Sequence, residues 1–156
     1  MEGLKLIVLD PASKDERGAT YEWVKGMQTR QLTICQRNKG TVSGNHYHKG
    51  EDPSKRPERV LILRGIVKVR ACDGMQTVEN LIDNPFTEIN ISPRILHSYI
   101  AEEDTLFIEQ RTSPYDQINS DTYPHNTFED YLGEQSLTVH RQEIERFMFN
   151  QGGKLI

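Results

Sequence analysis

The 156-residue sequence has only two cysteines, Cys35 and Cys72, so a disulfide framework is excluded as the source of its stability. It also has no apolar run near the roughly 20 residues that a membrane-crossing helix needs. Its first residues, Met1 to Lys5, lack the basic start and the long apolar core of a signal peptide. We therefore expect a cytoplasmic protein with reduced thiols and no membrane partner.

An excess of positive charge is missing as well. The chain has 19 lysines and arginines against 23 aspartates and glutamates, which gives a formal net charge of −4. A protein that binds the phosphate backbone without sequence preference is normally strongly basic, so nucleic acid is not an expected partner. The length suits one domain, and the sequence has no internal repeat and no low-complexity tract.

Short segments rich in β-forming residues, separated by turn residues, cover most of the chain. They predict strands at Leu4–Leu9, Thr20–Val24, Thr29–Gln36, Thr41–His48, Val60–Leu63, Ile66–Ala71, Gln76–Leu81, Thr87–Ile91, His97–Ala101 and Thr105–Gln110. Residues 12–19 read as a polar loop. Because no helical segment lies between these strands, they indicate an all-β antiparallel sandwich or barrel, and not a parallel α/β sheet.

The last part of the chain has a different pattern. Val139–Phe149 places apolar residues among charges at helical spacing, and Gly152 and Gly153 follow as a stop. We expect a single domain over residues 1–156, with the barrel at about 4–124 and a helical C-terminal extension at about 125–156.

The most informative motif is the pair His46 and His48, separated by Tyr47. Strand side chains alternate between faces, so both imidazoles lie on one face and Tyr47 points to the other. A carboxylate on a following strand, such as Glu58, can meet this pair, and three ligands with an open position make a reactive metal site.

The spacing of Gly40, His46, His48, Glu58 and Gly65 resembles the first motif of the cupin superfamily, whose fold is a small jelly-roll barrel. A second cupin motif contains a proline, a glycine and a third histidine. Here the stretch from Ile91 to His97 supplies Pro93 and His97, without the glycine and with a gap one residue short.

Within the cupins, Gly44–His48 is similar to a Gly-Asn-His-x-His stretch of two groups that act on sugar nucleotides. One group comprises nucleotide-diphosphate-keto-sugar ketoisomerases. The other is the C-terminal cupin domain of bifunctional capsule-polysaccharide enzymes, which epimerises a UDP-linked keto-sugar. Segments 17–24 and 115–123 resemble the second group. The resemblance implies an isomerase or epimerase of a nucleotide-linked keto-sugar in surface-polysaccharide synthesis.

The resemblance also implies a ligand set, His46, His48, Glu58 and His97, for a divalent ion such as Zn²⁺, Fe²⁺, Mn²⁺ or Ni²⁺. Such an ion polarises a ketone oxygen and acidifies the neighbouring C–H. In a version without metal, the histidines themselves act as acid and base. The segment Lys49–Pro57 lengthens the usual spacing to the glutamate, so Glu51 and Asp52 are alternative ligands, and this insertion is a candidate lid.

Other residues are candidates for substrate binding. Guanidinium groups make bidentate contacts to phosphate, so Arg17, Arg30 and Arg64 are candidates for gripping a diphosphate. Glu109 and Tyr115 are candidates for facing the sugar. The expected ligand is a nucleotide sugar or a sugar, and related cupins are commonly dimers that exchange strands, which predicts a homodimer.

Two other functions fit the same motifs. An oxygenase with Fe²⁺ held by two histidines and a carboxylate would need an apolar pocket. A cupin that binds a metal or sugar without turnover is the second, because a fold alone does not determine function.

Overall fold

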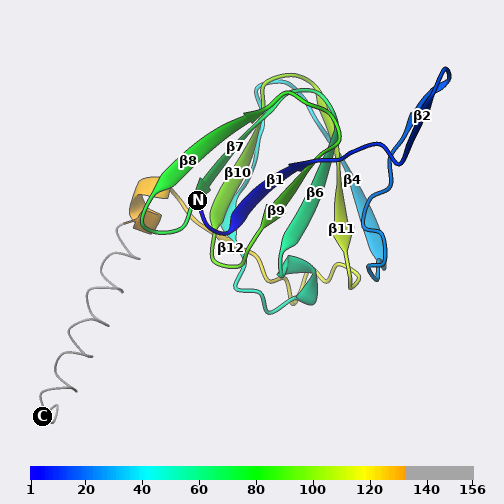
Figure 1. The fold of residues 1–156 in the computed structure, drawn as a ribbon. Coiled ribbons are helices and arrows are strands. Elements are labelled where there is room, and N and C mark those ends of the chain that lie inside the picture. Colours follow the sequence, from blue (N-terminus) through cyan, green and yellow to red (C-terminus); the bar gives the residue numbers. More distant parts are fainter. Residues whose placement is uncertain (133–156) are drawn as a thin grey trace, which may run out of the picture.

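The structure, a computed structural model, describes residues 1–132 (Figure 1). Its strands are β1 (Leu4–Val8), β2 (Ser13–Asp15), β3 (Gly18–Thr20), β4 (Gln31–Arg37), β5 (Val42–Tyr47), β6 (Glu58–Arg64), β7 (Val67–Cys72), β8 (Thr77–Ile82), β9 (Thr87–Ile91), β10 (Leu96–Ala101), β11 (Thr105–Arg111) and β12 (Tyr123–Pro124). A 3₁₀ turn, η1 (Pro53–Lys55), precedes β6, and residues 128–132 are helical.

Ten of these strands form two antiparallel five-stranded sheets, with the orders β1-β9-β6-β11-β4 and β12-β5-β10-β7-β8. The sheets face each other as a jelly-roll sandwich, as the strand pattern predicts (Figure 1). Inward-pointing residues of strands β6 to β11, together with Ile95 just before β10, form a core of Val60, Ile62, Val67, Val69, Ala71, Ile82, Ile89, Ile91, Ile95, Tyr99 and Phe107.

Nine of the ten predicted strands are present, with ends that differ by at most two residues, but the strand predicted at Thr20–Val24 is wrong. Val24 has a positive φ of 52°, and its carbonyl accepts a hydrogen bond from the amide of Met27 at 3.0 Å. The chain therefore turns where a strand would have to continue, and Gly26 supplies the left-handed backbone of that turn.

The predicted polar loop at residues 12–19 contains a short hairpin instead. Strands β2 and β3 pair antiparallel, and all six of their residues are exposed. In Figure 1 this hairpin extends away from the two sheets. The expected C-terminal helical segment begins at residue 128 within the described part, whereas Val139–Phe149 lies outside the described residues.

Gly65, between β6 and β7, has a φ of 89°, and a Cβ added there would lie 2.6 Å from the carbonyl oxygen of Asp104 and 2.9 Å from the Cα of Thr105. Gly26 is a matched position, because its φ is also positive at 74° but, apart from its two chain neighbours, no heavy atom of residues 1–132 lies within 4 Å of an added Cβ. At Gly65 the added methyl meets backbone, which has little room to move.

We predict that Gly65→Ala lowers the free energy of unfolding by more than about 2 kcal/mol, since it adds a backbone clash to the left-handed strain. Gly26→Ala carries the strain alone and should cost about 1 kcal/mol. Urea denaturation of both variants measures the difference. Equal losses would contradict the proposed role of close packing at Gly65.

Candidate active site

A cluster of three histidines and one glutamate connects the two sheets. His46 lies on β5, His48 directly follows that strand, and His97 lies on β10, opposite His46 in the strand register. Glu58 is the first residue of β6 in the other sheet. One potential ligand atom from each of the four residues lies within 4.8 Å of the others. The predicted ligand set therefore converges in space.

The hydrogen bonds of two imidazoles determine which ring nitrogen faces the cluster. Nδ1 of His97 lies 2.9 Å from the carbonyl oxygen of Ile95, and Nδ1 of His48 contacts the carbonyl of Asp121. A carbonyl only accepts, so both Nδ1 atoms carry the hydrogen. Each buried Nε2 is left facing the carboxylate of Glu58.

Both Nε2 atoms approach the same carboxylate oxygen of Glu58. Oε2 lies 2.6 Å from Nε2 of His48 and 3.5 Å from Nε2 of His97, while Oε1 accepts a hydrogen bond from Tyr99 at 3.3 Å. Two imidazole nitrogens and a carboxylate oxygen are ligands that suit a divalent transition metal, and all three are directed at one another in the buried cluster. The residues therefore fit a metal ion by their donor chemistry.

Lys55 is a further member of the site that sequence reasoning missed. Its ammonium Nζ lies 3.1 Å from Oε2 of Glu58 and 2.6 Å from Oε1 of Glu109, and its side chain is only 8% exposed. Burial alone would lower the pKa of Lys55, but the charges and hydrogen bonds of Glu58 and Glu109 outweigh burial and raise it. Lys55 therefore carries its positive charge into the site.

The buried carboxyl of Glu58 has the opposite shift. Burial by itself would raise the pKa of Glu58, but the charges of Lys55 and His97 and the contacts with His48 and His97 hold it well below its usual range. Glu58 is thus ionised, and it is the negative centre to which the surrounding donors are directed.

The insertion at Lys49–Pro57 forms part of the site's wall. The carboxylate of Asp121 accepts hydrogen bonds from the backbone amides of Lys49 at 2.9 Å, Gly50 at 2.8 Å and Asp52 at 3.1 Å. Because the carbonyl of Asp121 also contacts His48, one residue positions both the insertion and a histidine of the cluster. No sequence pattern pointed to this role.

The alternative carboxylates lie elsewhere. Asp52 caps η1 by accepting from the amide of Ser54 at 2.8 Å, and it also pairs with Arg111. Glu51 accepts from the hydroxyl of Tyr123 at 3.1 Å. Glu58, the preferred candidate, is the carboxylate that lies in the histidine cluster.

The cluster opens into a cavity of about 350 Å³ with a charged and polar lining. The lining comprises Gln31, Thr33, Cys35, Arg37, His46, His48, Lys55, Glu58, Glu109, Arg111, Tyr115 and Thr122. His97 is buried beneath this surface. Two predicted substrate-binding residues, Glu109 and Tyr115, thus face the same cavity as the histidines.

Arg111 joins these two side chains. Its guanidinium lies 3.2 Å from Glu109 and 5.3 Å from the centre of the Tyr115 ring. Arg111 was not predicted, although it is two residues after Glu109 on β11 and therefore shares its face, which was the available signal.

The three arginines predicted to grip a diphosphate are not part of this lining. Arg17 lies at the tip of the β2–β3 hairpin and pairs with Asp15 at 2.5 Å. Arg30 is exposed and precedes β4, while Arg64 is exposed at the end of β6 far from Glu58. Their role in substrate binding remains a prediction.

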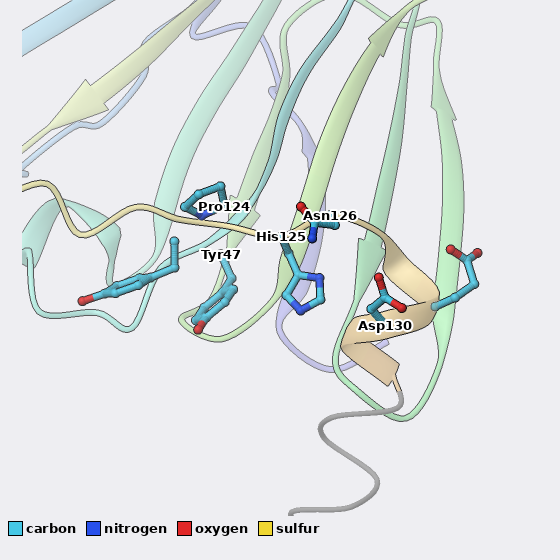
Figure 2. Close-up of a pocket in the computed structure, with 7 residues that line it drawn as sticks. Tyr47, Pro124, His125, Asn126 and Asp130 are labelled. Atoms are coloured by element: carbon cyan, nitrogen blue, oxygen red, sulfur yellow. The ribbon is translucent and has the colours of Figure 1, made fainter.

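Tyr47 points to the opposite face of β5, as the strand alternation predicts. It lines a second, more open pocket with Tyr123–Asn126, Glu129 and Asp130 (Figure 2). The rings of Tyr47 and Tyr123 stack with their centres 5.4 Å apart. This pocket therefore lies on the other side of the strand from the histidine cluster.

A family model described as the polysaccharide biosynthesis C-terminal domain matches residues 13–123. No curated protein matches the sequence. No helix within residues 1–132 has the length and apolar character needed to span a membrane.

Several solved structures share the fold at low identity. The sugar 3,4-ketoisomerase QdtA from Thermoanaerobacterium thermosaccharolyticum, in complex with TDP, is 15% identical, with a TM-score of 0.67 over 88% of this chain and 98% of that one. A mutant of QdtA, 16% identical, holds TDP-4-keto-6-deoxyglucose, with a TM-score of 0.65 over 86% of this chain and 95% of that one.

Two epimerases also share the fold at low sequence identity. The 3'-monoepimerase ChmJ from Streptomyces bikiniensis is 18% identical, with a TM-score of 0.66 over 85% of this chain and 74% of that one. The 3,5-epimerase RmlC from Legionella pneumophila is 22% identical, with a TM-score of 0.62 over 85% of this chain and 77% of that one.

The lowered pKa of His46 makes the free energy of unfolding depend on pH. Burial, followed by the charge of His97, lowers this pKa from 6.5 to about 3, although Glu58 acts in the opposite sense. The folded state then keeps His46 neutral at pH values where the unfolded chain binds a proton. Stability contributed by the neutral ring is present above pH 6.5 and is lost as the pH falls from 6.5 toward 3.

Between pH 6.5 and 5, we expect the free energy of unfolding to fall by up to about 1.4 kcal/mol per pH unit because of His46. This window lies above the range in which protonation of Glu58 contributes. His46→Gln should reduce the slope, as measured by urea denaturation at successive pH values. An unchanged slope in the variant would contradict the assignment.

Proposed function

Because the chain belongs to the polysaccharide biosynthesis C-terminal domain family, we propose that it is an isomerase or epimerase of a nucleotide-linked keto-sugar in surface-polysaccharide synthesis. The observation that carries this proposal is the convergence of three histidines and a glutamate on one charged cavity. The reaction we propose is removal of a proton from the carbon next to the ketone and its return to another face or carbon.

His46 is our candidate for the group that moves the proton. It is the histidine of the cluster that is only partly buried, and its ring lines the cavity. Its imidazole is neutral near neutral pH and so has a lone pair, but the pKa of about 3 also makes it a weaker base than free imidazole. The rings of His48 and His97 are fixed by hydrogen bonds from Nδ1 to backbone carbonyls. The hydroxyl of Tyr99 donates a hydrogen bond to Oε1 of Glu58.

The cofactor is a separate part of the proposal. Nε2 of His48, Nε2 of His97 and Oε2 of Glu58, with His46 beside them, would hold Zn²⁺, Fe²⁺, Mn²⁺ or Ni²⁺. A bound ion supplies Lewis acidity that polarises a ketone oxygen. The acid–base role of His46 needs only its neutral ring and its access to the cavity.

The charged cavity supports an anionic sugar nucleotide as the ligand. Arg37 lines the cavity and has no carboxylate partner within residues 1–132, so its guanidinium is the candidate for pairing with phosphate oxygens, whereas Lys55 and Arg111 are already paired with carboxylates. Glu109 and Tyr115 offer partners for sugar hydroxyls. The same charges count against the oxygenase alternative, which requires an apolar pocket.

The proposed reaction can be tested by proton exchange into TDP-4-keto-6-deoxyglucose, the sugar nucleotide held by the QdtA mutant. We predict that the wild-type protein, incubated with TDP-4-keto-6-deoxyglucose in heavy water, incorporates deuterium next to the ketone. His46→Asn should slow this exchange by about 10²-fold to 10⁴-fold, because it removes a general acid–base group. Mass spectrometry of the recovered sugar measures both rates.

His125→Asn is the matched control, since it changes a histidine outside the cluster and should keep the exchange rate. Absence of exchange in the wild type across a panel of nucleotide-linked keto-sugars would reject catalysis and support the non-catalytic binding protein.

We further propose that the protein is a homodimer in the cytoplasm. Ile34 and Leu32 on the edge strand β4 are 70% and 53% exposed, and both point away from the core. Exposed apolar side chains along an unpaired strand edge are typical of a surface that a partner covers. Cys35 and Cys72 are free thiols, in keeping with a reducing compartment, and cell fractionation would test the location.

For the dimer, we predict that sedimentation gives twice the 18.0 kDa mass of the chain for the wild type. Ile34→Lys should shift the protein to the monomer mass, because a charge replaces an apolar contact at the edge. Met75→Lys is the control, since Met75 is 81% exposed in the turn between β7 and β8, which belong to the other sheet. A monomeric wild type, or equal effects of both substitutions, would reject this interface.

A further inference from the structure

One oxygen of Glu58 has three competing neighbours. Oε2 lies 2.6 Å from Nε2 of His48, 3.5 Å from Nε2 of His97 and 3.1 Å from the ammonium of Lys55. The two imidazole nitrogens are metal ligands by their chemistry, but the ammonium is itself a cation. A divalent ion that used this oxygen would have to share it with an existing positive charge.

We propose that Lys55 competes with a divalent metal ion for Oε2 of Glu58, and that Lys55 thereby keeps the metal affinity of the site low. The proposal goes beyond the reaction proposed above, since it concerns cation binding and holds whether or not the protein turns over a sugar. It gives a role to the insertion that separates the histidine pair from the glutamate.

Lys55 is held firmly enough to compete. Its side chain is largely buried, and its ammonium also contacts Glu109 at 2.6 Å. Its backbone amide donates to the carbonyl of Asp52 at 2.9 Å, and the amide of Asp52 in turn donates to the carboxylate of Asp121 at 3.1 Å. A lysine side chain is normally flexible. Here the backbone hydrogen bonds position the turn, and the two carboxylate contacts of the ammonium restrict the side-chain rotamers.

The charges of the ion-pair network around Lys55 also favour competition between Lys55 and a metal ion. Asp52, Glu58 and Glu109 carry three negative charges, and the paired cations Lys55 and Arg111 carry two positive ones. The network therefore has a net charge of −1, and a divalent ion would change it to +1. Without the charge of Lys55 the network would be −2, and a divalent ion would bring it to zero. Buried charges are costly unless they are compensated, so the neutral combination is favoured.

The test is direct metal binding to the full chain after chelation and dialysis. We expect Lys55→Gln to bind one Zn²⁺ per chain at least about tenfold more tightly than the wild type in isothermal titration, because one repulsive charge is removed. Co²⁺ absorption spectra of the same variant should show imidazole and carboxylate coordination. Adding His97→Gln to Lys55→Gln should abolish the gain, which places the ion in the cluster.

Two further variants separate charge from packing. Lys55→Arg keeps the positive charge and should bind Zn²⁺ as weakly as the wild type. Lys49→Gln removes an exposed charge of the same insertion and should also leave binding weak. Gains as large as that of Lys55→Gln in either variant would overturn the proposal.

The wild type gives a result that does not depend on any variant's folding. We expect it to bind Zn²⁺ with a dissociation constant weaker than about 1 μM, well short of structural zinc sites. Stoichiometric binding of Zn²⁺ by the wild type below that value, or equal affinities of the wild type and a folded Lys55→Gln, would overturn the proposed competition.

Discussion

The buried carboxylate of Glu58 is the group on which the two sheets, the insertion and the cavity all depend. It stands at the start of β6 in one sheet, and it meets His48 and His97 from the other sheet and Lys55 from the insertion. An ionised carboxylate survives burial only where several donors or cations compensate it. The site is therefore part of what holds this end of the sandwich together, as well as a candidate place for chemistry.

The fold provides this arrangement through strand register. His46 and His97 lie opposite each other on neighbouring strands, and the alternation of β10 places Tyr99 on the same face as His97. Asp121, far along the chain, then connects the insertion to the barrel through three backbone amides and contacts His48 through its carbonyl. Residues that are not ligands thus determine the orientation of those that are.

Much of this was predictable from the sequence, and the failures have physical causes. Period-two alternation located the strands and the histidine pair, because both depend on local geometry. The turn at Val24 was missed because a β-branched residue with a positive φ contradicts its own propensity. Lys55 and Asp121 were missed because their roles depend on contacts between distant segments, such as Lys55 with Glu109, that no local pattern encodes.

The insertion supplies the site with a positive charge as well as part of its wall. Lengthening the segment between His48 and the glutamate could have removed the carboxylate from the cluster, but the register of β6 keeps Glu58 facing the histidines. What the added residues introduce is the 3₁₀ turn that carries Lys55 inward. The same ligand geometry can thus serve a metal or an ammonium as its positive partner. Whether the site holds a metal or an ammonium then depends on Lys55, which is not one of the four candidate metal ligands.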